Sequence, residues 1–163
     1  MEQQFIGMLN KHRGIIYKVC NLYCDDTEDR RDLFQEIVLQ LWRSFPSFRN
    51  DSSPSTWMYR IGLNTAITNF RKDSKRPERI AISERELQIP DMTYLSEKSE
   101  NINLLKQAME CLNHIEKAIM MLYLEEKSYE EISEIVGISR SNVGVKINRI
   151  KTKLETIIKT QML

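Results

Sequence analysis

The residues after Ser139 carry the clearest chemical pattern in the sequence. From Arg140 onward, basic and hydrogen-bonding side chains recur, and no acid occurs until Glu155. On a helix of 3.6 residues per turn, many of them share one outward face. That face consists of Arg140, Ser141, Gly144, Lys146, Asn148, Arg149, Lys151 and Lys153. Such a helix fits the major groove of DNA, where residues near its N-terminus reach base edges and lysine and arginine meet phosphates. A helical hairpin with a solvated basic face is the alternative.

The segment before this helix predicts a short helix that would hold it in place. Ser128 and Glu131 have the spacing of a capping box. Gly137 can adopt the left-handed conformation that ends a helix, and Ser139 can cap the next one. The apolar residues of both helices then face inward, namely Ile132, Ile135, Val136, Val143, Ile147, Ile150 and Leu154. The pattern predicts a helix-turn-helix.

A second polar stripe is expected on a helix that begins near Ser55. Steps of three or four residues place its members on one face: Trp57, Arg60, Asn64, Thr68 and Arg71. This mixture suits a partly single-stranded nucleic acid, because exposed bases can stack on an aromatic ring, worth roughly 1–3 kcal/mol each. Lys72 and the basic run that follows it are expected to contact phosphates. Trp57 has a second interpretation, as an anchor in the hydrophobic core.

No catalytic constellation is evident. His12 and His114 have no convincing nucleophile partner, and five dispersed glycines leave no phosphate-binding loop. The acids of 25–29 lack the compact oxygen-ligand loop of a calcium site. Four residues have the spacing of a metal site: Cys20, Cys24, Cys111 and His114. Since free cysteine is among the most commonly buried residue types, we instead expect reduced, buried thiols and no metal site. We also expect no cofactor and no enzyme activity.

Charge is segregated along a chain whose net charge is only +1. Residues 41–80 hold eight basic and three acidic residues, and 137–163 hold six and one. Between them, 81–136 hold twelve acidic and five basic residues. Two basic blocks around an acidic one predict two separate contacts with an anionic partner, although a solvated surface can show milder segregation.

The hydropathy pattern excludes a membrane protein. No apolar run approaches the roughly 20 residues that span a bilayer. The first residues lack the basic segment and the apolar run of a secretion signal. We therefore expect a cytoplasmic protein with no membrane insertion.

Helical periodicity extends over nearly the whole chain, and no strand pattern of comparable length occurs. The fold class is therefore expected to be all-α. Between 74 and 101 the periodicity weakens and prolines, serines and charges gather, which is typical of a linker. We predict two small helical domains, 1–73 and 102–163, joined by the linker 74–101, with the helix-turn-helix in the second.

Three segments resemble the extracytoplasmic-function (ECF) group of RNA polymerase sigma factors. Residues 124–154 resemble region 4, whose helix-turn-helix reads the upstream (−35) promoter element. Residues 32–43 resemble region 2.2, which docks on the clamp helices of the largest polymerase subunit. Residues 55–66 resemble regions 2.3 and 2.4, which act at the downstream (−10) element. These motifs occur in the family's order and at its spacing.

The resemblance implies a role for each group of polar residues. The −35 element would be contacted by Arg140, Ser141, Asn142, Gly144, Val145, Lys146, Asn148 and Arg149. The −10 element would be contacted by Trp57, Arg60, Asn64, Thr68, Arg71 and Lys72, with Asn64 close to the captured base. The polymerase clamp helices would be contacted by Asp32, Gln35, Glu36 and Gln40, while Leu33, Ile37 and Leu41 pack inward.

The sequence departs from the family pattern at Gly144 and Val145. Many members carry a basic residue followed by serine at these positions, so the base contacts of those residues cannot be transferred. A glycine inside a helix costs about 1 kcal/mol relative to alanine. One hypothesis is that Gly144 lets the helix backbone approach the DNA closely.

The implied function is that of an alternative sigma factor, which directs promoter recognition, DNA melting and transcription initiation. Its expected partners are the RNA polymerase core, promoter DNA and an anti-sigma factor. A stand-alone helix-turn-helix regulator is the alternative function. That class would leave the motifs of 32–43 and 55–66 without a role.

Overall fold

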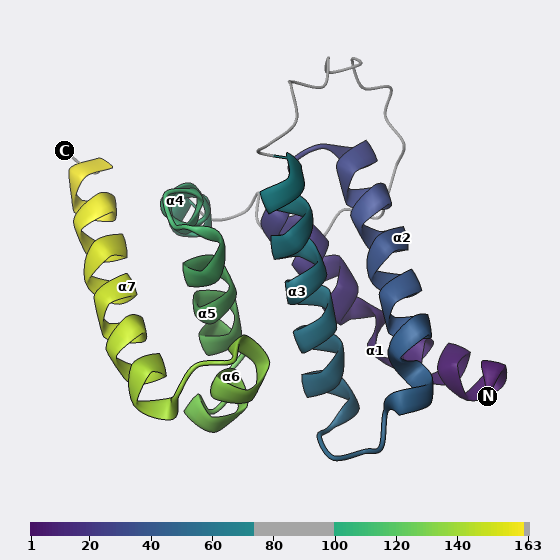
Figure 1. The fold of residues 1–163 in the computed structure, drawn as a ribbon. Helices are drawn as coiled ribbons and strands as arrows, with labels where there is room; N and C mark the ends of the chain where they lie inside the picture. Colours follow the sequence, from purple (N-terminus) through teal and green to yellow (C-terminus); the bar gives the residue numbers. More distant parts are fainter. Residues whose placement is uncertain (74–99, 162–163) are drawn as a thin grey trace. The chain divides into compact units, whose positions relative to one another are not determined.

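The computed structural model describes residues 1–73 and 100–161, without the side chains of 71–73. These residues form helices joined by turns, and no strand occurs among them, so the predicted all-α fold class is confirmed. The chain divides into two compact units, Met1–Leu87 and Gln88–Leu163 (Figure 1). The predicted linker lies outside the described residues except for Glu100 and Asn101, which open the first described helix of the second unit.

In residues 1–73, the described part of the first unit, three α-helices pack pairwise. They are α1 (Glu2–Tyr23), α2 (Thr27–Ser44) and α3 (Pro54–Asp73), and a short 3-10 helix, η1 (Phe45–Ser47), follows α2. Each α-helix buries one apolar face. The fully buried residues include Ile16 and Val19 of α1, Ile37 and Leu41 of α2, and Met58 and Ala66 of α3. This core holds the polar outer faces of α2 and α3 in fixed orientations.

Helix α3 begins at a proline and passes close to both neighbouring helices. The Thr56 backbone N–H donates to Ser53 Oγ at 3.1 Å, and Pro54 opens the helix, where its missing N–H costs no hydrogen bond. At Gly62, an added Cβ would lie 3.7 Å from Val19 Cγ2 and 3.8 Å from Ile37 Cγ2. These are ordinary van der Waals distances, so α3 packs against α1 and α2 at Gly62 with room for a methyl group.

In residues 100–161 of the second unit there are four helices, and the last of them packs against the other three. They are α4 (Glu100–Glu110), α5 (His114–Leu124), α6 (Tyr129–Val136) and α7 (Arg140–Gln161). With 22 residues, α7 is about 33 Å long at 1.5 Å per residue. Its buried face lies on a core to which α5 and α6 contribute Ile119, Leu122 and Ile132.

Candidate functional site

The turn between α6 and α7 has the geometry that the sequence predicts. Ser128 Oγ accepts from the Glu131 backbone N–H at 3.1 Å, and Glu131 Oε1 accepts from the Ser128 N–H at 3.3 Å, which completes the capping box. Gly137 has φ 81° and ψ 31°, the left-handed conformation that ends α6. Ser139 Oγ accepts from the Asn142 N–H at 3.2 Å and caps α7. The helix-turn-helix is thus fixed at three points by local hydrogen bonds and backbone conformation.

One further bond closes the turn from the inside. The Ser133 hydroxyl of α6 donates to the Ile138 carbonyl, which lies beyond Gly137. No residue pattern in the sequence indicates this contact. This hydrogen bond links α6 to the residue that precedes the cap of α7. The angle between the two helices therefore depends on this bond as well as on the left-handed conformation of Gly137.

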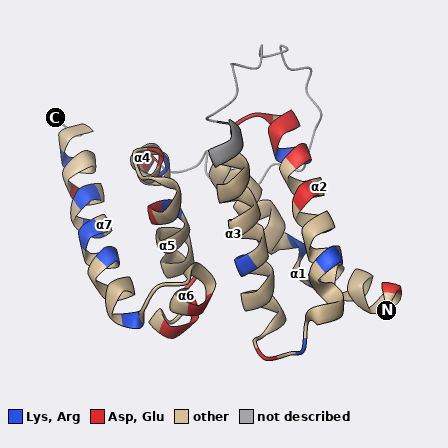
Figure 2. Ribbon diagram, viewed as in Figure 1, with Lys and Arg blue, Asp and Glu red and all other residues tan. Residues whose placement is uncertain are grey.

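Helix α7 separates its apolar and polar side chains onto two faces. Val143, Ile147, Ile150 and Leu154 are all buried, as the spacing predicts. The candidate DNA contacts of the outward face are exposed, namely Arg140, Ser141, Asn142, Val145, Lys146, Asn148 and Arg149. Basic residues recur along α7 in Figure 2, while α6 carries acids. The second unit therefore presents a mostly polar, basic surface from the residues expected to enter a major groove, with Val145 exposed among them.

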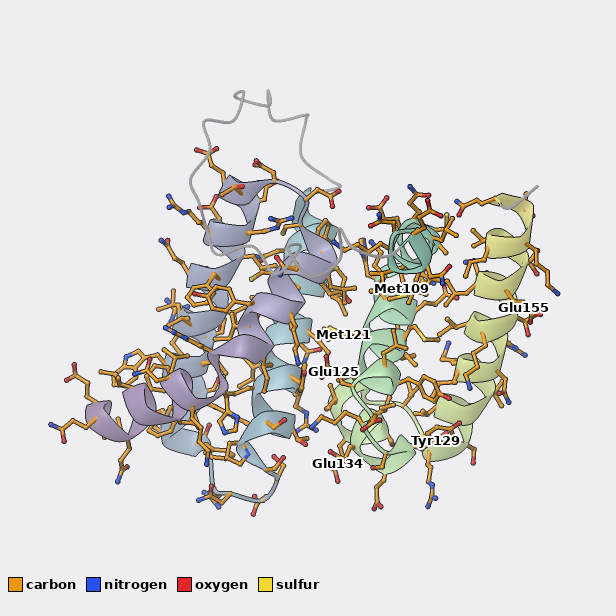
Figure 3. The ribbon with its side chains drawn as sticks, turned by 180° about the vertical axis from the view of Figure 1, so that it is seen from behind. Met109, Met121, Glu125, Tyr129, Glu134 and Glu155 are labelled. Atoms are coloured by element: carbon orange, nitrogen blue, oxygen red, sulfur yellow. The ribbon has the colours of Figure 1, made fainter. Side chains whose placement is uncertain are left out.

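Gly144 differs from the other predicted contacts because it is only half-exposed. A Cβ at this position would lie 3.5 Å from Cε2 of Tyr129, so the open side of the glycine faces an aromatic ring. Figure 3 shows Tyr129 at the junction between α6 and α7. The ring is itself 37% exposed. Gly144 thus has a packing role toward α6 that the sequence did not indicate, and its approach to DNA stays a prediction.

Two lysines of the basic face are bound to α5. Lys151 Nζ donates to Tyr123 Oη at 2.6 Å, and Lys153 Nζ lies 3.3 Å from Glu116 Oε1. The same Glu116 oxygen accepts from the Asn113 N–H at 3.0 Å in a second capping box, which starts α5. The basic face therefore has two parts, one in the N-terminal half of α7 and one whose lysines are exposed but also contact α5.

The capping box also sets the electrostatics of the start of α6. Hydrogen bonds from the Ser128 backbone lower the pKa of the Glu131 carboxyl below its ordinary value of 4.5. Lys127, whose Nζ lies 3.6 Å from Glu131 Oε2, acts in the same direction. The negative charge at the helix N-terminus also interacts favourably with the helix dipole.

The polar stripe on α3 has exposed and packed members. Arg60, Asn64 and Thr68 are exposed and lie four residues apart, so they form one row along the helix. Trp57 is half-buried and stacks on Phe48 with ring centroids 4.6 Å apart. Its ring thus packs on the loop before α3, in accordance with the core-anchor interpretation. The side chains of Arg71 and Lys72 lie outside the described part of the structure.

The candidate polymerase contacts lie together on α2. Asp32 and Gln35 are exposed, and Glu36 and Gln40 are half-exposed. Gln40 Nε2 donates to Glu36 Oε1 at 2.9 Å, so these two side chains form a pair. Leu33, Ile37 and Leu41 are buried, as expected. The helix therefore presents a polar ridge on a rigid apolar base.

An apolar groove beside this ridge was missed by the sequence analysis. It has a volume of about 440 Å³ and is lined by Glu2, Phe5, Ile6, Phe34, Gln35, Val38, Leu39 and Trp42. Ile6, Leu39 and Trp42 are among the exposed large apolar residues. The sequence shows that apolar residues recur along α2. It does not show that some of these residues lie outside the surface that α1 and α3 cover.

The cysteines agree only in part with the expectation of buried thiols. Cys20 and Cys24 are buried, and burial raises the pKa of each thiol to about 12. Cys111 is exposed, so the prediction is wrong there, because the residue lies just beyond the end of α4. Within residues 1–73 and 100–161, no group of three or more histidine, cysteine or acidic residues could hold a metal ion. Among the helices of the same residues, none combines the length and hydropathy that a membrane span requires.

Because the second unit contains a helix-turn-helix, the chain is a helix-turn-helix protein. Comparison with known families assigns the chain to a narrower class. The sigma-70 region 2 model matches residues 8–76, and the sigma-70 region 4 model matches residues 102–154. Because the two matches span more than half of the sequence, the chain belongs to the sigma-70 family of RNA polymerase sigma factors, in its ECF group. The resemblance noted in the sequence is confirmed.

Curated relatives and solved structures agree with this assignment. The ECF RNA polymerase sigma-E factor of Escherichia coli K12 is 30% identical over 148 residues, which cover 80% of this chain and 76% of the relative. The RNA polymerase sigma factor YlaC of Bacillus subtilis is 28% identical over 133 residues, covering 78% and 76%. Both relatives are matched over most of their length.

Two solved structures share the fold. The sigma factor RpoE, in complex with the anti-sigma factor NepR from Bartonella quintana, has a TM-score of 0.67 at 18% identity, over 97% of this chain and 96% of that one. CnrH, in complex with the cytosolic domain of CnrY, has a TM-score of 0.69 at 17% identity, over 98% and 90%. The all-α fold is thus one that solved sigma factors adopt.

Proposed function

We propose that the chain recruits RNA polymerase to a set of promoters as an alternative sigma factor. Residues 1–73 would bind the polymerase core and the −10 element, and residues 102–163 would bind the −35 element, with 74–101 as the linker. Each unit alone offers little contact area, so selectivity comes from the sum of two weak readouts. The mechanism requires no covalent chemistry, and we propose no enzyme activity.

The observation that carries this proposal is the capped helix-turn-helix with an exposed basic face, within a region 4 match. Arg140, Ser141 and Asn142 stand at the N-terminus of α7, where a recognition helix meets base edges. Lys146 and Arg149 would neutralise phosphates, and Asn148 would donate to or accept from a base edge. Gly144 and Val145 complete the proposed −35 surface.

At the −10 element, we propose that the row on α3 holds the melted strand. Asn64 would read the captured base, since it stands in the middle of the exposed row with Arg60 and Thr68 on either side. Arg71 and Lys72 would contact the backbone. Trp57 would support this surface through its stacking on Phe48.

At the polymerase, Asp32, Gln35, Glu36 and Gln40 would contact the clamp helices of the largest subunit. The apolar groove next to Gln35 adds a surface that a partner helix can bury. An anti-sigma factor that covers the same faces would act as inhibitor. RpoE and CnrH, the two structural neighbours, were each solved with a protein partner. A partner of the polymerase works in the cytoplasm, which is the location that we propose.

The direct test is binding of the purified chain to sigma-free core polymerase, measured by co-elution. Glu36→Arg should abolish co-elution and leave the circular dichroism spectrum unchanged, because Glu36 is half-exposed. Glu110→Arg is the matched control, with the same charge change at an exposed residue of α4. If the unmodified chain, free of any inhibitor, did not bind core polymerase but bound duplex DNA, a stand-alone regulator would replace this proposal.

A further inference from the structure

The recognition surface of α7 contains an apolar patch. Val145 is 47% exposed, although most of the exposed side chains around it, such as Ser141, Asn148 and Arg149, are polar. Helical geometry places Val145 four residues after Ser141 and four before Arg149, in the row that points away from the buried face. An isopropyl group at the centre of this face has no role in holding the unit together.

A second exposed aromatic group lies beside the preceding residue, Gly144. The ring of Tyr129 is 37% exposed, and a Cβ on Gly144 would lie 3.5 Å from ring atom Cε2. Val145 follows Gly144 directly in the helix, and Gly144 itself has no side chain. The residues at 144 and 145 therefore bring no polar side chain to this part of the surface.

The chemistry of the major groove offers one apolar group to such a surface. Among the base edges exposed there, thymine alone carries a methyl group, at C5, and protein side chains read it by apolar contact. Cytosine, guanine and adenine present polar donors and acceptors, which valine cannot satisfy. A basic neighbourhood brings duplex DNA to the patch, because Arg140, Lys146 and Arg149 attract phosphates.

We propose that Val145 reads the methyl group of a thymine in the upstream promoter element, with Tyr129 covering the side of that contact. This inference rests on the proposed function of α7 as a recognition helix. It assigns a base preference at the position where the sequence departs from the basic and serine residues of many family members. The element bound by this chain accordingly contains a thymine opposite Val145, in the N-terminal half of α7.

The test removes one methyl group at a time from the DNA. Duplexes that bind the holoenzyme, reconstituted from the full chain and core polymerase, are first enriched from a random upstream region. Each thymine of the enriched element is then replaced by uracil, and affinity is measured by fluorescence anisotropy. We expect one replacement to weaken binding about fourfold, the effect of withdrawing one buried methyl group from an apolar contact.

Variants of the chain assign the effect to its residue. Val145→Ala should bind the thymine and uracil duplexes with equal affinity, because the methyl group has lost its partner. Arg149→Ala is the control: it should weaken binding to both duplexes by one common factor and keep the fourfold ratio. Circular dichroism and urea unfolding check that both variants fold, which their exposure favours.

The outcomes separate the two proposals. If no duplex is enriched, the proposed function fails and this inference fails with it. If a promoter is bound but uracil is tolerated at every position, or if Val145→Ala keeps the full thymine preference, the inference is overturned while the sigma function stands.

Discussion

Glu116 and Lys153 connect the start of α5 to the C-terminal half of α7. Glu116 Oε1 lies 3.3 Å from Lys153 Nζ and also accepts from the Asn113 backbone N–H at 3.0 Å. One carboxylate thus completes a helix cap and an ion pair between residues 37 positions apart. This arrangement adds a side-chain link between α5 and α7 to the apolar packing of Val143, Ile147, Ile150 and Leu154.

Substitution of these two residues should have unequal effects on stability. Glu116→Ala removes a capping interaction and should lower the free energy of unfolding by about 1 kcal/mol. Lys153→Ala removes only a partly exposed ion pair and should cost about 0–1 kcal/mol. Urea unfolding of both variants measures the difference. Because Glu116→Ala removes the ion pair as well as the cap, equal losses for the two variants would show that the ion pair, and not the cap, is the main contribution.

The two parts of the basic face should respond differently to salt. Arg149 is exposed and free of any contact named above, so Arg149→Ala should reduce the slope of log affinity against log salt by about 1. Lys151 donates to Tyr123, so Lys151→Ala should leave the slope nearly unchanged. Titrations of promoter binding by the holoenzyme between low and moderate salt measure both slopes. Equal reductions would mean that Lys151 leaves Tyr123 and neutralises a phosphate when DNA is bound.

Gly144→Ala should stabilise the second unit. Alanine removes the helix cost of glycine, about 1 kcal/mol, and its Cβ would meet the Tyr129 ring at 3.5 Å, an ordinary van der Waals distance. Thermal unfolding monitored by circular dichroism measures the gain. The same variant tests the hypothesis that the helix backbone approaches DNA closely: higher stability with unchanged promoter affinity would exclude that hypothesis, whereas weaker binding would support it.

Features that depend on neighbouring residues could be predicted from the sequence. The capping box of Ser128 and Glu131, the left-handed Gly137 and the buried face of α7 all arise within three or four residues along the chain. The capping box of Asn113 and Glu116 has the same spacing and was missed only because asparagine takes the place of serine. Local geometry determines these features, so the pattern of residue types is enough to find them.

Features that depend on how helices pack could not be predicted in this way. The contact of Gly144 with Tyr129 and the bond from Lys151 to Tyr123 join residues from different helices. The apolar groove likewise requires knowledge of how much of α2 is covered by α1 and α3. Helical periodicity identifies a face but not its neighbours, so the division of the basic face into two parts, one of which contacts α5, emerged only from the structure.

The stability of the second unit should fall at low pH through Glu131. The pKa of this carboxyl is lower in the folded chain than its ordinary value of 4.5, mainly because the Ser128 backbone donates to the charged form. A group with a lowered folded pKa contributes stability above its unfolded pKa, and that contribution disappears as the pH falls through the folded value. The contribution should therefore be complete at neutral pH, begin to decline near pH 4.5 and be lost below the lowered pKa.

Comparison with Glu131→Gln isolates this effect. The amide can still accept from the Ser128 N–H but carries no charge that titrates, so the difference in unfolding free energy between the two chains should shrink with acidification. Glu155→Gln is the control for an exposed acid of the same unit whose pKa is lowered by a different partner, Lys159. Urea unfolding of the three chains at several pH values between 3 and 7 provides the measurement. A difference between the original chain and Glu131→Gln that stayed constant over this range would mean that the capping hydrogen bonds stabilise α6 without any contribution from the charge.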